Sequence, residues 1–161
     1  MEPWRRLDLA SPGEARTLLA GCCGSARWVD AMLARRPFGS TTALVESAAS
    51  IWRGLSEADW IEAFSQHPKI GDQRAGGVAR REQASVASAS EEIVRELANA
   101  NREYEARFGY IFIICATGKS AESMLEALRN RLENEANTEI RIAAEEQLKI
   151  TQLRLAGAGQ P

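Results

Sequence analysis

The chain has 161 residues, of which 45% are hydrophobic, and its 20 basic and 22 acidic residues leave a formal net charge of −2. This length and composition are enough for one domain with a core of its own, so we expect a single helical domain over residues 1–161. Basic and acidic residues are interleaved, and no apolar run is long enough to span a bilayer, so neither nucleic acid nor a membrane is an expected partner.

Helix signals follow one another along the first part of the chain. A serine N-cap, a proline and a carboxylate within residues 11–14 predict a helix that ends at about Cys23. Ser25 caps a second helix, which Pro37 ends, and a third helix covers residues 40–53. The apolar positions of this third helix, which we expect to face the core, are Leu44, Val45, Ala48, Ile51 and Trp52.

A short helix begins at Ser56 and leads into residues 66–72, which contain the only histidine of the chain. Pro68 biases His67 away from helical backbone angles, and the glycines that follow mark an irregular loop. His67 is therefore expected where a helix gives way to a loop, a position that functional residues often occupy.

Three further helices are predicted in the second part of the chain, over residues 90–107, from a cap at Ser120, and over residues 138–155. Residues 110–115 are the only strand-like run between them. Because a single strand has nothing to pair with, this run is expected to be buried extended chain or a helical segment. Successive helices with short connections predict an all-α fold, a compact multi-helix bundle.

The cysteines and the chain ends predict a cytoplasmic protein. The three cysteines are Cys22, Cys23 and Cys115; their number is odd and two are adjacent, which fits a reducing compartment better than a disulfide framework. Residues 1–9 lack the apolar core of a secretory signal, and the last residues lack a peroxisomal address. We expect Cys115 to be a packed, inert thiol, and one histidine without a Cys-x-x-Cys pair predicts no metal site.

Periodicity alone does not locate an active site. His67 is the only side chain whose unperturbed pKa lies near neutrality, but a lone histidine is often structural. Taken by itself, Glu82 is typical of a solvated helix residue, and Arg154 of a surface charge that interacts favourably with a helix C-terminus. A more specific signal comes from the order of short motifs along the chain.

Six motifs stand between about Trp4 and Leu155. They are Arg36-Pro37-Phe38, His67-Pro68-Lys69-Ile70-Gly71-Asp72, Glu82-Gln83, Tyr104-Glu105-Ala106-Arg107-Phe108-Gly109, Glu145-Glu146-Gln147-Leu148-Lys149-Ile150 and Leu153-Arg154-Leu155. In this order, the motifs resemble the OHCU decarboxylase family, whose substrate is 2-oxo-4-hydroxy-4-carboxy-5-ureidoimidazoline. The resemblance covers nearly the whole chain, and its His-Pro-x-Ile-Gly-Asp and Arg-Phe-Gly blocks are specific.

The resemblance implies an all-helical carboxy-lyase without a cofactor, usually a homodimer, that converts OHCU to (S)-allantoin in urate degradation. By motif, His67 and Glu82 match the catalytic histidine and glutamate. Substrate-binding positions are matched by Pro68, Gln83, Phe112, Ile113 and Arg154, among which Phe112 and Ile113 are implied to act through their backbone amides.

Two positions depart from the family pattern. Ala79 stands where many members have a serine that contacts the ligand, and Ile111 stands where some have proline. Neither change removes a catalytic group. Two alternatives stay open at this point: a hydrolase or isomerase that acts on a related cyclic ureide, and a non-catalytic helical interaction module.

Overall fold

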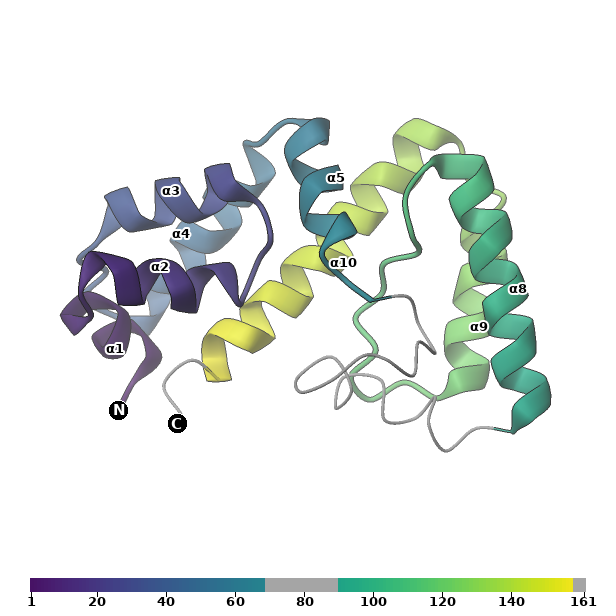
Figure 1. Ribbon diagram of the computed structural model, residues 1–161, viewed down its shortest axis with the longest axis horizontal. Coiled ribbons are helices and arrows are strands. Elements are labelled where there is room, and N and C mark those ends of the chain that lie inside the picture. The colour runs from purple at the N-terminus through teal and green to yellow at the C-terminus, as the bar shows by residue number, and fades with distance from the viewer. Residues whose placement is uncertain (69–89, 158–161) are drawn as a thin grey trace. The chain divides into compact units, whose positions relative to one another are not determined.

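The computed structural model describes residues 1–68 and 90–157, and within these ranges it contains eight α-helices and no β-strand (Figure 1). The predicted all-α class is therefore confirmed. None of the helices in these two ranges is both long enough and apolar enough to cross a bilayer.

The chain divides into two compact units, which are described separately below. The first comprises residues 1–63 and 147–161, and the second comprises residues 64–146. Both divisions fall inside helices, namely α5 (Glu57–Ser65) and α10 (Ala136–Gly157). A single domain over residues 1–161 stays a prediction.

The first unit contains α1 (Pro3–Leu9), α2 (Pro12–Ala20), α3 (Ala26–Arg35), α4 (Thr41–Arg53) and parts of α5 and α10. The predicted N-caps Ser11 and Ser25 are present, and Ser40 caps α4 as well: the hydroxyl oxygens of these three serines each accept a hydrogen bond from the backbone N–H three residues later. Trp28 and Trp52 fill the core, and the indole of Trp28 donates to the Ala48 carbonyl at 3.2 Å.

The structure differs from the predictions for this unit in three places. Helix α1 was not predicted, because Glu2 at its N-cap makes no side-chain capping bond. Helix α2 ends at Ala20 rather than at about Cys23, and the two cysteines that follow it are buried outside any helix. Val45 is 36% exposed, because the buried face of α4 runs through Leu44 and the positions four and eight residues later.

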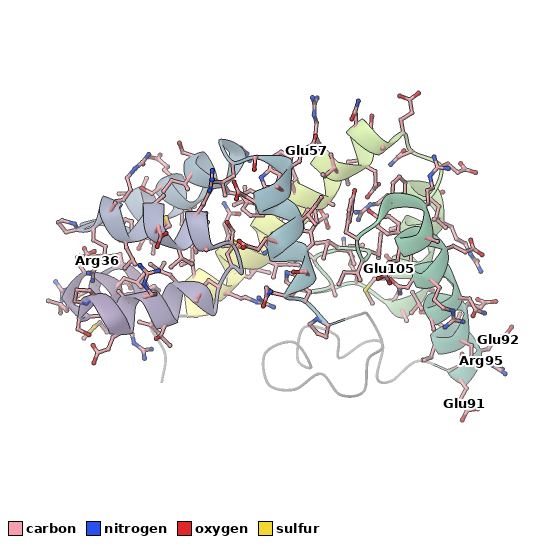
Figure 2. All side chains as sticks on the ribbon, turned by 45° about the horizontal axis from the view of Figure 1, so that its top comes forward. Arg36, Glu57, Glu91, Glu92, Arg95 and Glu105 are labelled. Carbon is pink, nitrogen blue, oxygen red and sulfur yellow. The ribbon has the colours of Figure 1, made fainter. Side chains whose placement is uncertain are left out.

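Asp8 and Arg36 tie α1 to the segment that follows α3. The Arg36 guanidinium donates to the carbonyls of Leu7 at 2.7 Å and Ala10 at 2.9 Å, which are left open at the end of α1. The Asp8 carboxylate in turn accepts from the backbone N–H groups of Phe38 and Gly39 at 2.9 and 3.0 Å. Figure 2 labels Arg36 among these N-terminal helices. The Arg-Pro-Phe motif therefore has a structural role here.

The second unit is built on α8 (Glu91–Phe108) and α9 (Ala121–Arg131), which pack side by side (Figure 1). Ser120 caps α9 as predicted, and Ser90, where the other helix was predicted to begin, caps α8. Figure 2 shows Glu91 and Glu92 projecting from the first turn of α8, where carboxylates interact favourably with the helix dipole.

Gly109 ends α8 in the left-handed conformation with φ +85°, which glycine adopts without steric cost. Residues 110–116, called the connecting segment below, then run to α9 without helix or strand. Of the two expectations for this run, buried non-helical chain is the one observed: Phe112 and Ile113 are each 2% exposed.

Candidate active site

The predicted site residues fall into three groups. His67 and Pro68 follow α5 and are half-buried, while Phe112 and Ile113 lie in the connecting segment; all four belong to the second unit. Arg154 is half-buried near the end of α10 and belongs to the first unit. The predicted Glu82 and Gln83, together with Ala79, lie outside the described residues.

The end of α5 packs against the connecting segment. The backbone N–H of His67 donates to the carbonyl of Phe64 at 3.2 Å, which ties the histidine to the last turn of the helix. The ring of Phe64, which is fully buried, lies 5.2 Å from the ring of Tyr110 between centroids. The second unit therefore brings the turn that carries His67 to the start of the segment that carries Phe112 and Ile113 (Figure 1).

In the described part of the chain, only some of the backbone hydrogen-bonding groups of the connecting segment have a partner. The Ile113 carbonyl accepts from Arg131 at 2.7 Å, and the Cys115 N–H donates to Glu146 at 3.0 Å. Within residues 1–68 and 90–157, the N–H groups of Phe112, Ile113 and Ile114 donate no hydrogen bond. Buried backbone N–H groups are nearly always paired in proteins, so this stretch is suited to bind the carbonyl or carboxylate oxygens of a ligand.

A buried charged cluster holds this segment, and the sequence alone did not predict it. The Glu139 carboxylate, which is fully buried, accepts from the Arg131 Nη2 and Nε at 2.6 and 2.9 Å and from Asn134 at 3.1 Å. The hydroxyl of Tyr104 also donates to Glu139. Burial, together with this bond to Glu139, raises the pKa of Tyr104 well above its usual value, so the phenol stays protonated.

The sequence did contain a signal for this cluster. Arg131 follows Leu128 by three residues, on the same helical face as Met124, and so continues the apolar stripe of α9. Glu139 stands four residues before Ala143, which is fully buried in α10. Charged residues at stripe positions of two successive helices are typical of a buried ion pair, because an unpaired buried charge is strongly unfavourable.

Arg154 has two buried thiols in its electrostatic surroundings. Burial raises the pKa of Cys22 to about 12 and that of Cys23 to about 11, and in both cases the positive charge of Arg154 opposes the rise. The buried hydroxyl of Thr151 accepts from the side-chain amide of Gln147 at 3.0 Å in the same helix, and its proximity also opposes the rise in the pKa of Cys23. Within the first unit, the positive charge of Arg154 therefore acts on two buried thiols that stay protonated at neutral pH.

Two sequence predictions about reactive or metal-binding groups bear on this site. Cys115 is half-buried, so its thiol is less enclosed than predicted. In the part of the chain that the structure describes, no three or more histidine, cysteine or acidic side chains gather in a way that could hold a metal ion.

Comparison with known proteins gives a consistent family. The family model described as OHCU decarboxylase matches residues 9–156. The uric acid degradation bifunctional protein TTL of Arabidopsis thaliana is 41% identical over 144 residues, which are 84% of this chain and 44% of that protein. The 2-oxo-4-hydroxy-4-carboxy-5-ureidoimidazoline decarboxylase of Haloferax volcanii is 25% identical over 75% of this chain and 74% of that protein.

A solved structure agrees with these matches. The crystal structure of an OHCU decarboxylase in the presence of (S)-allantoin is 39% identical, with a TM-score of 0.79 over 88% of this chain and 96% of that one. The chain spans less than half the length of the bifunctional relatives that it matches, 44% for TTL and 26% for PucL of Bacillus subtilis. Since the family model extends over nearly all of its residues, the chain belongs to the OHCU decarboxylase family.

Proposed function

We propose that this chain is a carboxy-lyase that converts OHCU to (S)-allantoin in uric acid degradation. The observation that carries the proposal is the family match over residues 9–156. It is supported by a relative of similar size, 39% identical, whose structure was determined in the presence of (S)-allantoin. His67 and Glu82 are the proposed catalytic residues, and Pro68, Gln83, Phe112, Ile113 and Arg154 the proposed substrate-binding residues.

The chemistry of the substrate explains why two side chains without a cofactor suffice. The carboxylate leaves a ring carbon next to a C=N bond, and the electron pair released flows onto that imine. The ring thus supplies the electron sink that a cofactor provides in other decarboxylases. The protein has to orient the carboxylate, hold the neighbouring hydroxyl, and direct one proton to one face of the ring.

Each proposed residue has a role in this scheme. Glu82 accepts a hydrogen bond from the hydroxyl as it becomes a ketone, and His67 positions the leaving carboxylate or transfers the proton. Arg154 presents a planar pair of donors that matches a ureido or carboxylate oxygen. The N–H groups of Phe112 and Ile113, which donate no hydrogen bond within the described part of the chain, supply further donors for the ring carbonyls. Acid–base positioning of this kind contributes about 10²–10⁴-fold in rate.

Two finer statements are proposals as well. We propose a homodimer, as the family resemblance implies, and a cytoplasmic location, to which two adjacent cysteines with protonated, buried thiols are suited. Sedimentation of the purified protein tests the first, and localisation of the tagged protein in its own cells tests the second.

The decisive experiment replaces His67, the only histidine of the chain. OHCU is generated from urate by the two upstream enzymes, and allantoin formation is followed by circular dichroism. We expect His67→Asn to fold with an unchanged far-ultraviolet spectrum but to lose most of the rate enhancement, since the amide hydrogen-bonds but does not shuttle a proton. Allantoin that still forms should be close to racemic.

The exposed neighbour Gln66 provides a matched control. Gln66→Ala should produce (S)-allantoin as fast as the unmodified protein. If His67→Asn does so too, the histidine is structural and the proposed mechanism is wrong. A cyclic-ureide hydrolase or isomerase would act without releasing carbon dioxide, and a helical interaction module would not change the rate at all, so the same assay with carbon dioxide detection separates the alternatives.

A further inference from the structure

We propose that Arg131 is a positioning residue of the decarboxylation: locked by Glu139, it fixes the peptide plane that presents the Ile114 N–H to the substrate, next to the Phe112 and Ile113 N–H groups of the same segment. The inference rests on the proposed function, because it assigns a task to a buried cluster that no step of the reaction uses directly.

Arg131 is bonded directly to the backbone of the connecting segment. The Nη1 of Arg131 donates to the Ile113 carbonyl at 2.7 Å. In a planar trans peptide the carbonyl and the following N–H point in opposite directions, and the cis bond among the described residues is elsewhere, at Arg36-Pro37. A guanidinium that holds the Ile113 oxygen on one side therefore directs the Ile114 N–H to the other side.

The guanidinium of Arg131 is itself held in one orientation. Its Nε and Nη2 donate to Glu139 at 2.9 and 2.6 Å, so the planar fork is held at one edge while Nη1 holds the segment. The guanidinium carbon also lies 4.4 Å from the centre of the Phe112 ring, which adds a cation–π contact to the same segment. Arg131 is only 8% exposed, so water does not compete for these bonds.

A second charged residue restrains the next peptide. The carboxylate of Glu146, which is 9% exposed, accepts from the Cys115 N–H at 3.0 Å. Two consecutive peptide planes, 113–114 and 114–115, are thus each held by a charged side chain from a neighbouring helix. Most loops run over the protein surface, where water satisfies their backbone groups, whereas this buried connection between α8 and α9 has a charged partner at each of two consecutive peptides.

The test compares Arg131→Lys with two controls on the same helix. An ammonium retains the charge but does not bond Glu139 and the Ile113 carbonyl in one fixed plane. We expect the affinity for (S)-allantoin, measured by calorimetry, to fall about tenfold, with a matching rise in KM for OHCU, at a temperature where the variant is fully folded. Arg129→Lys, at an exposed position, should leave both values unchanged.

The second control removes stability without touching the polar cluster. Leu128→Ala opens a cavity at a fully buried position of α9 and should lower Tm while leaving affinity and KM unchanged. If Arg131→Lys lowers only Tm, as Leu128→Ala does, Arg131 is structural and the inference is wrong. If the unmodified protein does not accelerate (S)-allantoin formation, the proposed function has failed instead.

A further variant applies if Arg131→Lys does not fold. Replacing all members of a buried ionic cluster with apolar residues of similar size is often tolerated. The triple variant Tyr104→Phe, Arg131→Met and Glu139→Leu should therefore fold, yet bind (S)-allantoin at least tenfold more weakly. Unchanged affinity of this folded variant would overturn the proposed positioning role.

Discussion

Replacing Glu139 with glutamine should lower the free energy of unfolding far more than replacing a surface carboxylate does. The carboxylate is fully buried and accepts three hydrogen bonds from Arg131, at 2.6, 2.9 and 3.2 Å, besides those of Tyr104 and Asn134. Glutamine removes the negative charge, so Arg131 is left buried without its counter-ion. The NH₂ group of the glutamine also replaces an acceptor with a donor that faces other donors. Breaking one side of a buried pair in this way costs about 3–5 kcal/mol.

The chain offers a matched control in the pair between Glu96 and Arg129. Its N–O distance is 3.7 Å, and its side chains are 38% and 58% exposed. Glu96→Gln should therefore change the free energy of unfolding by about 1 kcal/mol or less. Urea unfolding followed by far-ultraviolet circular dichroism measures both variants. For a chain of this length, the loss at Glu139 corresponds to a Tm lower by about 6–20 °C.

The difference between the two variants is the decisive quantity. If Glu139→Gln is destabilised no more than Glu96→Gln, the cluster is solvated in solution and the reasoning from burial is refuted. If only the slope of the free energy of unfolding against urea concentration changes, the substitution has altered the surface area that is exposed on unfolding.

Three further outcomes are expected. Arg154→Lys should weaken turnover while leaving the helical spectrum intact, because an ammonium does not reproduce the guanidinium fork; unmodified kinetics would return Arg154 to the class of surface charges. Since the thiols of Cys22 and Cys23 keep their protons up to pH values of about 12 and 11 in the folded state, against 9.0 when exposed, the free energy of unfolding should fall as pH rises from 9 to 11. The decline is about 1.4 kcal/mol per pH unit for each thiol, and a Cys22→Ala/Cys23→Ala variant with the same slope as the unmodified protein would contradict it. Activity should survive exhaustive chelation without added cofactor, because the substrate is its own electron sink; loss of activity that one metal restores would defeat this prediction.

The sequence predicted the helices best where their ends are fixed by local chemistry. Ser11, Ser25, Ser40, Ser90 and Ser120 each cap a helix within one residue of the predicted start, because a capping bond spans only three residues. The predicted end of α8 at residue 107 is one residue from the observed end, because Gly109 adopts the positive φ that stops the helix there. Both signals are readable without knowledge of the rest of the fold.

The predictions of helix ends and burial fail where residues far away in the sequence determine the local structure. Helix α1 has no capping side chain of its own, and its C-terminal carbonyls are satisfied by Arg36, which lies two helices later. Cys22 and Cys23 extend the apolar pattern beyond α2 because they are buried by tertiary packing, not because the helix continues. Val45 was expected in the core because periodicity gives the direction of a helical face but not its width.

The candidate site was predicted from motifs and not from helix signals. Periodicity did not distinguish His67 from a structural histidine, and the ordered motifs supplied the functional hypothesis. The structure places Phe112 and Ile113 in a segment whose N–H groups donate no hydrogen bond to any residue of 1–68 or 90–157, which no property of these apolar side chains indicates. The Arg131–Glu139 pair was missed because charged residues were read as surface residues, although their helical positions indicated burial.

The hydrogen bonds that Asp8 and Arg36 each make to the backbone of the other's segment make these two residues a single target of selection. Each satisfies backbone groups on the other's segment, so the loss of one leaves carbonyls or N–H groups open that the other does not reach. In a lineage that loses Arg36, the carbonyls at the end of α1 lose their donor. Asp8 then contributes little to the stability of this region, and its position becomes free to vary. Across related sequences the two positions should accordingly be retained together or replaced together, and α1 should shorten or change sequence most in the lineages where both have gone.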